Sequence, residues 1–159
     1  MLGCWLSSES TSCIYVVIYR PSTNRQMEPF FKELELLLKF VLSFQGGIVI
    51  WGDFNIHVNK PADNHPRRFR NILEWFGLVQ LVEGPTRRSG VRDTGNTLDL
   101  VIVRRHCQPT TDCDVQAPHI SDHSFITCRF SLSSLTAEDR GIEATTSWTL
   151  FYKVTIDYK

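Results

Sequence analysis

The sequence lacks a net charge, because 17 lysines and arginines balance 17 aspartates and glutamates in 159 residues. A neutral chain has no general attraction to nucleic acid or to acidic membranes. The sequence also lacks a run of roughly 18 apolar residues, the length that a membrane span needs. Its first residues have neither a basic stretch nor a long apolar core, so we expect no secretory signal peptide. These absences disfavour a membrane protein and leave nucleic-acid binding to local clusters of charge.

Cysteine is scarce and scattered, which disfavours a framework of disulfides. The five cysteines are Cys4, Cys13, Cys107, Cys113 and Cys128. Cys13 and Cys128 lie in strand-like apolar runs, so we interpret them as buried thiols in a reducing, intracellular compartment. A zinc site would have to combine Cys107, Cys113, His119 and His123. The segment between the two pairs is too short for the usual zinc finger, so we disfavour this site.

The sequence does contain an ordinary globular mixture, with 42% hydrophobic and 21% charged residues, which suits one domain with a sizeable core. Periodicity predicts helices over 28–44 and 66–75, and strands over 13–19, 48–51, 78–82, 97–103 and 124–132. This alternation indicates a mixed α/β fold.

We divide the chain into three parts, which are a leader (1–12), a domain (13–132) and a tail (133–159). The tail is polar over 136–147 and lacks periodicity, so we expect it to be partly disordered. A strand over 148–158 is the alternative for its last part.

Polar side chains follow the predicted strand 48–51 at Gly52-Asp53-Phe54-Asn55. Asp53 and Asn55 are two residues apart, which places them on the same side of an extended chain. The Asp53 carboxylate can take a proton from an attacking water. The Asn55 amide can donate to a phosphate oxygen without adding negative charge. An Asx-type turn after the strand explains the same residues without any chemistry.

Asp99 is an acid within the apolar strand 97–103, and burial of an unpaired carboxylate is costly. We therefore expect a partner, and His123 in Ser121-Asp122-His123 is the candidate. A carboxylate on one imidazole nitrogen fixes the tautomer and stabilises the protonated ring, which can then bind phosphate. Asp122 is a natural oxygen ligand for Mg²⁺. Asp99 facing solvent, and the triplet forming a surface loop or cap, are the alternatives.

These three motifs, in this order, resemble the endonuclease/exonuclease/phosphatase family. The histidine after GDFN, the Pro85-Thr86-Arg87 segment and the strand 97–103 favour the endonuclease domain of non-LTR (LINE-type) retrotransposons. The resemblance covers 13–132. It implies a DNase I-like fold, part of a four-layer α/β sandwich, and Mg²⁺-dependent hydrolysis of DNA phosphodiesters, with Mn²⁺ as the alternative metal.

The resemblance also implies a role for each matching residue. Asp53 positions or deprotonates the nucleophilic water, and Asn55 binds phosphate. Asp99 orients His123, which contacts the scissile phosphate, and Asp122 belongs to the metal site. Tyr19 matches the phosphate-contacting tyrosine of a tyrosine-proline segment, with core packing as the alternative. Thr86 matches a threonine that contacts DNA.

Relatives carry an asparagine and a metal-ligating glutamate on strands that precede the tyrosine-proline segment. Here Asn24 is the first asparagine, and Glu9, in a loop-like serine-rich context, is the only glutamate before Tyr19. We do not assign Glu9 as the ligand. We therefore expect an N-terminally truncated domain with weak or no activity, so whether the chain is an enzyme stays open.

Three other functions stay open beside the endonuclease. One is a phosphatase acting on small phosphorylated substrates, since this fold hosts several. Another is a non-catalytic nucleic-acid-binding module that uses clustered arginines, and the third is a relic without selected function. The clusters are Arg67, Arg68 and Arg70, then Arg87, Arg88 and Arg92, then Arg104 and Arg105. We expect DNA as the partner, no membrane, and an intracellular, nuclear location. The oligomeric state and the target DNA sequence are left open.

Overall fold

The computed structural model describes residues 2–7, 12–22, 26–88, 94–105, 113–116, 122–131 and 147–152. Five strands form one sheet in the order β1 (Leu2–Ser7), β2 (Ser12–Tyr19), β3 (Gly47–Asp53), β5 (Asp99–Arg104) and β4 (Leu78–Gln80). Strands β2 and β3 are parallel, and the other neighbours are antiparallel. A second, antiparallel sheet of three strands contains β6 (Asp114–Gln116), β7 (Phe125–Ser131) and β8 (Ser147–Tyr152).

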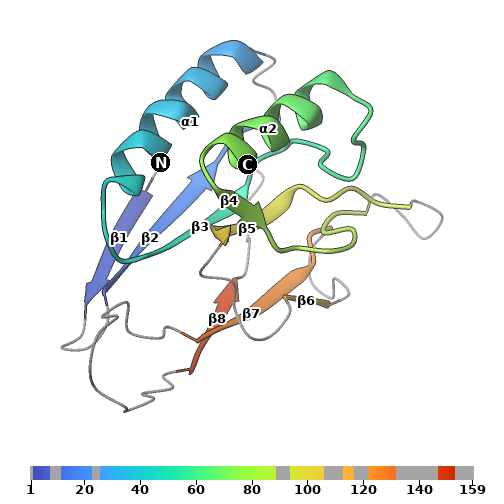
Figure 1. Ribbon diagram of the computed structural model, residues 1–159. Helices are drawn as coiled ribbons and strands as arrows, with labels where there is room; N and C mark the ends of the chain where they lie inside the picture. The colour runs from blue at the N-terminus through green and yellow to red at the C-terminus, as the bar shows by residue number, and fades with distance from the viewer. Residues whose placement is uncertain are drawn as a thin grey trace.

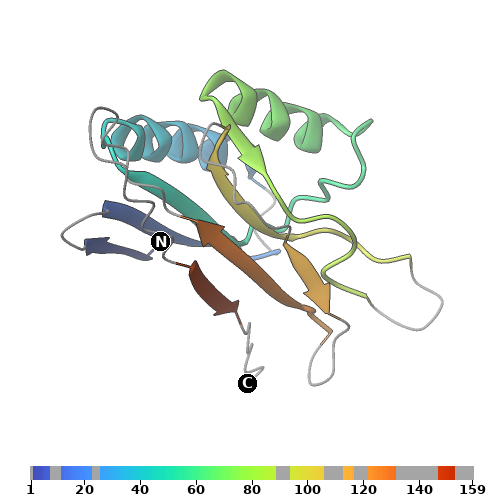
Figure 2. The same cartoon turned by 60° about the horizontal axis from the view of Figure 1, so that its bottom comes forward.

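The elements stack in layers, with the helices α1 (Met27–Leu42) and α2 (Asn64–Trp75) on one face of the five-stranded sheet and the second sheet on the other (Figures 1 and 2). Alternate residues of a strand point to opposite faces. Ile48 and Ile50 of β3 accordingly pack under the helices, and Val49 packs towards the second sheet. The central strands are therefore apolar on both faces, as their continuous hydrophobic runs predict.

The helix α1 forms where the sequence predicts it. Its buried side chains recur every three or four residues and face the sheet: Met27, Phe30, Phe31, Leu34, Leu38 and Val41. Glu28 in the first turn and Lys39 in the last turn oppose the helix dipole favourably. The helix connects the parallel strands β2 and β3, so it sets the register in which the ends of these strands meet.

Two strands lie in segments that we interpreted as a leader and a tail. Strand β1 pairs with β2 from Leu2↔Val17 to Ser7↔Ser12, and β8 pairs with β7 from Ile126↔Tyr152 to Ser131↔Ser147. Residues 2–7 of the leader thus form a strand that the sequence analysis did not predict, and the alternative strand in the tail is present at 147–152. Pairing with a neighbouring strand stabilises both segments, and short segments carry little local signal for it. The three-part division itself stays a prediction.

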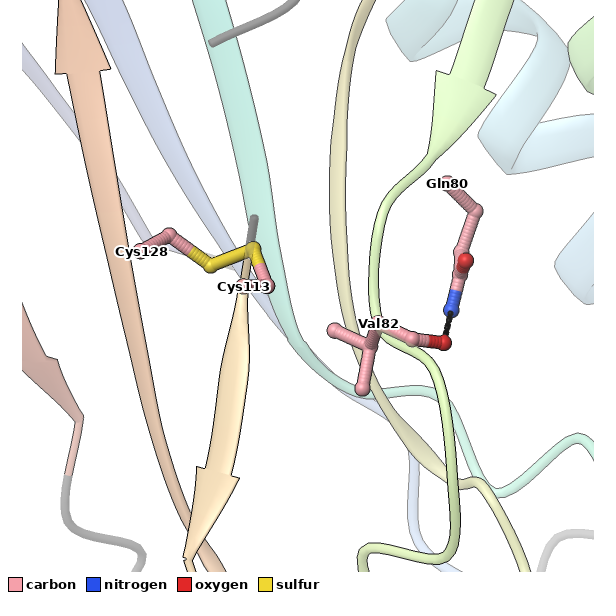
Figure 3. The surroundings of a disulfide bond; sticks show 4 residues. All are labelled: Gln80, Val82, Cys113 and Cys128. Atoms are coloured by element: carbon pink, nitrogen blue, oxygen red, sulfur yellow. Dashed lines mark hydrogen bonds between the residues drawn. A yellow bond between two sulfur atoms is a disulfide. The ribbon is translucent and has the colours of Figure 1, made fainter. Parts of the chain in front are cut away.

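Cys113 and Cys128 form a disulfide between the start of β6 and β7, beside the part of the chain that holds Gln80 and Val82 (Figure 3). The interpretation of Cys128 as a thiol is therefore wrong, whereas Cys13 is buried as predicted. The disulfide also takes Cys113 out of the disfavoured zinc set, and Cys107 and His119 lie outside the described residues. Cys128 no longer argues for a reducing compartment.

Among the described helices, none combines the length and the apolar character that crossing a bilayer requires.

Candidate active site

Three predicted site residues meet at one edge of the five-stranded sheet. Strand register places Tyr19 at the end of β2 opposite Asp53 at the end of β3, and places Asp53 opposite Asp99 at the start of β5. Paired residues point to the same face of a sheet. The register therefore brings the carboxyl groups of Asp53 and Asp99 side by side.

The turn after β3 depends on two unusual backbone conformations. Gly52 has a φ of 136°, and a Cβ atom there would collide with the carbonyl oxygen of Ile18. Only glycine allows this close approach between β2 and β3. Asn55 follows at a φ of 49°, in the left-handed region that asparagine tolerates. Beyond Asp53 the chain continues beside residues 97 and 98, since the N–H of Phe54 donates to the carbonyl oxygen of Leu98 at 3.0 Å.

The side chain of Asp53 is held by its own motif. Its Oδ1 accepts the backbone N–H of Asn55 at 2.9 Å, and its Oδ2 accepts the Asn55 amide at 2.9 Å. The same amide nitrogen donates to the carbonyl oxygen of Arg20 at 2.6 Å. The Asx-type turn is therefore present, together with the arrangement that chemistry needs. Both amide hydrogens of Asn55 are directed to protein oxygens, so Asn55 supports Asp53 here instead of presenting a donor to phosphate.

Asp53 is only 2% exposed. Burial and, after it, the nearby charge of Asp99 raise the pKa of Asp53 to about 6, against the hydrogen bonds from Asn55. A carboxyl group with this pKa is mostly ionised at neutral pH, yet it holds a proton more readily than an ordinary aspartate does. It can accept a proton and release it again, as a general base must.

Asp99 and His123 form the buried pair that the sequence predicts. The Nδ1 atom of His123 lies 2.9 Å from Oδ2 of Asp99, and both residues are buried. The alternative in which Asp99 faces solvent is therefore wrong. The hydrogen bond to Asp99 raises the pKa of His123, against the effect of burial. Asp99 thus favours a protonated ring whose other nitrogen, Nε2, lies on the edge away from Asp99.

The residues present fit a divalent cation. Ligand atoms of Asp53, Asp99 and His123 all lie within 4.8 Å of one another. Oδ1 of Asp99 is buried and has no hydrogen-bond partner among the described residues. Two adjacent carboxylates, one with an orphaned oxygen, are the donors that Mg²⁺ prefers, and a cation would offset their repulsion. Since Nδ1 of His123 already faces Asp99, the carboxylates are the stronger candidate ligands.

Asp122 lies outside this cluster, contrary to its predicted place in the metal site. Its Oδ2 accepts the Nε of Arg87 at 2.7 Å. Burial alone would raise the pKa of Asp122, but the hydrogen bond and the charge of Arg87 hold it below its usual range. Asp122 is therefore an anchor for Arg87 in this structure. Ser121, beside it in the motif, is not among the described residues.

Tyr19 is 56% exposed, so the alternative of core packing is wrong and its ring is open to solvent beside Asp53. Thr86 is fully buried, and its hydroxyl accepts the backbone N–H groups of Leu98 and Asp99. The prediction that Thr86 contacts DNA is therefore wrong.

Sequence reasoning missed Arg20, which directly follows β2. Its backbone N–H donates to the carbonyl oxygen of Asp53 at 2.9 Å, and its guanidinium donates to that of Asn55 at 3.2 Å. Burial lowers the pKa of Arg20, and the charge of Asp53 opposes this shift. The only sequence signal was an arginine between an apolar strand and Pro21. Such an arginine is as often exposed on the surface as it is buried.

A hollow of about 480 Å³ opens beside the cluster. Its polar lining includes Arg20, Asn55, His57, His65, Arg87 and Asn96. Asn55 of this lining donates to Asp53, so the hollow adjoins the cluster through that side chain. It offers hydrogen-bond donors and positive charge within reach of a substrate held at the cluster.

Comparison with known proteins gives a consistent result. A family model described as endonuclease-reverse transcriptase matches residues 13–127. The endonuclease domain of TRAS1, a telomere-specific non-LTR retrotransposon, superposes with a TM-score of 0.61 and 16% identity over 76% of this chain and 56% of that one. The 3′ phosphatase NExo from Neisseria, bound to a product DNA hairpin, superposes with a TM-score of 0.54 and 20% identity over 79% of this chain and 63% of that one. A search of curated proteins finds no match.

The chain therefore spans less than two thirds of the length of either solved structure. At these identities the likeness is one of fold, and it confirms the predicted DNase I-like α/β architecture.

Proposed function

The chain belongs to the endonuclease-reverse transcriptase family, and on that basis we propose that it carries a divalent-metal-dependent site for hydrolysing DNA phosphodiester bonds. The observation that carries the proposal is the buried cluster of Asp53, Asp99 and His123 at the ends of β3 and β5 and before β7. Structural packing alone gives no reason to bury two neighbouring carboxylates, one of them with an orphaned oxygen. Such groups are tolerated where chemistry needs them.

In the proposed reaction, Asp53 takes the proton of a water that attacks the phosphorus atom. A new bond forms between the water oxygen and phosphorus as the ester P–O bond breaks. His123, held protonated by Asp99, faces the negative charge that develops on the phosphate oxygens. Asn55 and Arg20 keep the Asp53 segment in place through their hydrogen bonds.

Asp53 and Asp99 would hold the metal, which we propose to be Mg²⁺ or alternatively Mn²⁺. When bound, the cation would neutralise charge on the phosphate and polarise it. The cluster contains two carboxylates among the described residues. Because the family resemblance implies a further glutamate ligand, we propose that the activity of these 159 residues alone is weak.

The substrate that we propose is DNA in a nuclear location. The donors and arginines of the hollow support this choice, since phosphate contacts supply much of the affinity of DNA-binding proteins. The two solved structures with a similar fold are DNA-processing proteins by their descriptions. Their names support the proposal by analogy of fold, and the geometry of this site supports it independently.

The test is nicking of supercoiled plasmid by the purified chain with Mg²⁺, with Mn²⁺ and with EDTA. The informative variants are Asp53→Ala and His123→Ala. Asp114→Asn, an exposed acid on β6, is the matched control for the loss of one carboxylate. Metal-dependent nicking that persists in the control and disappears in both site variants would support the proposal.

Nicking at equal rates in all variants would identify a contaminant and contradict the proposal. Salt-dependent DNA binding without any nicking would favour the non-catalytic module instead. Hydrolysis of a small phosphate ester with no action on plasmid would favour the phosphatase.

A further inference from the structure

The segment 84–88 crosses between the strand that carries Asp99 and the chain that carries His123. Thr86 lies at its centre and is 0% exposed. Its hydrogen bonds reach both motifs, because it contacts Leu98 and Asp99 on one side and Ser124 on the other. A residue in this place can set the relative position of the two side chains without touching a substrate.

The hydroxyl oxygen of Thr86 is the first point of attachment. It accepts the backbone N–H of Leu98 at 3.0 Å and that of Asp99 at 3.0 Å. A hydroxyl oxygen has two acceptor lone pairs, so these two bonds use both. The start of β5, where the Asp99 side chain emerges, is thereby fixed to residue 86.

The backbone of the same segment is the second point of attachment. The carbonyl oxygen of Thr86 accepts the N–H of Ser124 at 2.7 Å, directly after His123. The backbone of Arg87 forms an isolated antiparallel β-bridge with that of His123, and the Nε atom of Arg87 donates to Asp122 at 2.7 Å. One residue and its neighbour thus hold the chain on both sides of His123.

We propose that Thr86 is a positioning residue, which holds Asp99 and His123 at hydrogen-bonding distance through its hydroxyl on one side and its carbonyl on the other. The proposal rests on the proposed function, because positioning matters for the rate only if the pair takes part in catalysis. The pair itself has a separation of 2.9 Å. A hydrogen bond weakens steeply when its geometry opens, and small misplacements in an active site are costly.

The decisive variant is Thr86→Val, which replaces the hydroxyl by a methyl group of similar size. Two buried N–H groups would then face carbon, and the start of β5 must shift to find other acceptors. Amide hydrogen exchange at Leu98 and Asp99 should quicken about tenfold or more. In the proton NMR spectrum the low-field Nδ1–H signal of His123 should broaden or disappear. Thr86→Ser keeps the oxygen and should keep the signal.

Thr97→Val is the matched control. Thr97 is also buried, and its hydroxyl donates to the carbonyl oxygen of Gly84 at 2.6 Å, outside the Asp99–His123 pair. This control should lose a similar amount of thermal stability while the His123 signal stays. An unchanged His123 signal and unchanged amide exchange in Thr86→Val would overturn the proposal. Equal loss of the His123 signal in Thr86→Val and in Thr97→Val would also overturn it.

Folding and activity are separated from positioning by two further measurements. If Thr86→Val does not fold, Thr86→Ala removes the oxygen without placing a methyl group against the N–H donors. If alanine also abolishes folding and serine restores it, the role is structural and the positioning proposal fails. Where plasmid nicking is measurable, Thr86→Val should lower kcat about tenfold or more with little change in KM. Absence of nicking in the parent chain counts against the proposed function only, since the NMR result does not depend on it.

Discussion

The two halves of the candidate site are built by different means. Around Asp53 the supporting atoms come from the same motif, because Gly52 makes the close approach possible and Asn55 binds the carboxylate two residues away. Asp99 and His123 are 24 residues apart, and a third segment holds them together. A local motif can specify its own geometry, whereas a long-range pair depends on residues that no motif contains. Substitutions in the two halves should therefore fail in different ways.

The largest expected effect is on the local half. Gly52→Ala places a Cβ atom against the carbonyl oxygen of Ile18 at a φ that alanine disfavours. We expect a loss of about 3 kcal/mol or more in the free energy of unfolding. Urea denaturation measures it, with Gly77→Ala as control because a Cβ atom there meets no described atom within 4 Å although φ is also positive. Equal losses in both variants would show that only backbone strain matters and that the close approach does not.

The next effect tests the long-range half through its electrostatics. Asp99→Asn removes the carboxylate whose hydrogen bond raises the pKa of His123, while the burial that lowers that pKa stays. NMR titration should therefore show a lower pKa for His123 in the variant than in the parent chain. Any nicking activity should fall about 100-fold or more. A His123 pKa that does not move would mean that the two residues do not interact in solution.

A smaller effect separates strain from hydrogen bonding at Asn55. Asn55→Ala loses the side-chain hydrogen bonds to Asp53 and to the carbonyl oxygen of Arg20, and it also places alanine at a φ of 49°. Asn55→Gly also loses the side-chain bond to Asp53, but glycine adopts the left-handed backbone conformation without steric strain. We expect a cost of about 2 kcal/mol for alanine and about 1 kcal/mol for glycine in urea denaturation. If glycine is as damaging as alanine, the hydrogen bonds dominate and the left-handed backbone costs little.

The smallest effect concerns pH. The pKa of Asp53 is raised from 3.8 to about 6 in the folded chain, so this group binds more protons folded than unfolded between these values. Its contribution favours folding at low pH and is lost as the pH rises through about 6. Asp53→Asn should therefore stabilise the chain by about 1 kcal/mol at pH 7.5 in EDTA, and this gain should shrink as the pH falls from about 6 to about 4.

Thermal unfolding across this pH range is the measurement for Asp53→Asn. Mg²⁺ should raise the Tm of the parent chain at pH 7.5 and leave that of the variant nearly unchanged, because the variant lacks one proposed ligand. A variant that is less stable than the parent chain at every pH would contradict the burial penalty on Asp53.

Sequence reasoning succeeded where the local sequence contains a hydrophobic period or a charged residue whose burial would be costly. The apolar runs predicted the strands around β3 and β5, and the spacing of α1 predicted its buried face. The cost of burying Asp99 predicted a partner, and the structure pairs it with His123. The same reasoning failed where an element or a bond exists only through the pairing of two strands. Strand β1 exists through its pairing with β2, and the Cys113–Cys128 bridge needs two strands side by side.

Arg20, Thr86 and Arg87 were missed or misjudged for a related reason. Each residue type is common on protein surfaces. Nothing in the neighbouring sequence distinguishes a solvated arginine from one that donates a hydrogen bond to a carbonyl oxygen. Burial distinguishes them, as in the fully enclosed side chain of Thr86. The local half of the site could thus be read from the sequence, and the scaffold of the long-range half could not.

The disulfide between Cys113 and Cys128 encloses His123 in a closed loop, with its ends 15 positions apart. In the unfolded chain such a loop removes conformations that a reduced chain would regain, which amounts to about 3 kcal/mol of chain entropy for a loop of this size. The reduced and the oxidised chain are therefore two proteins of different stability with one sequence. Thiol reductant in the buffer decides which of them an experiment on His123 studies.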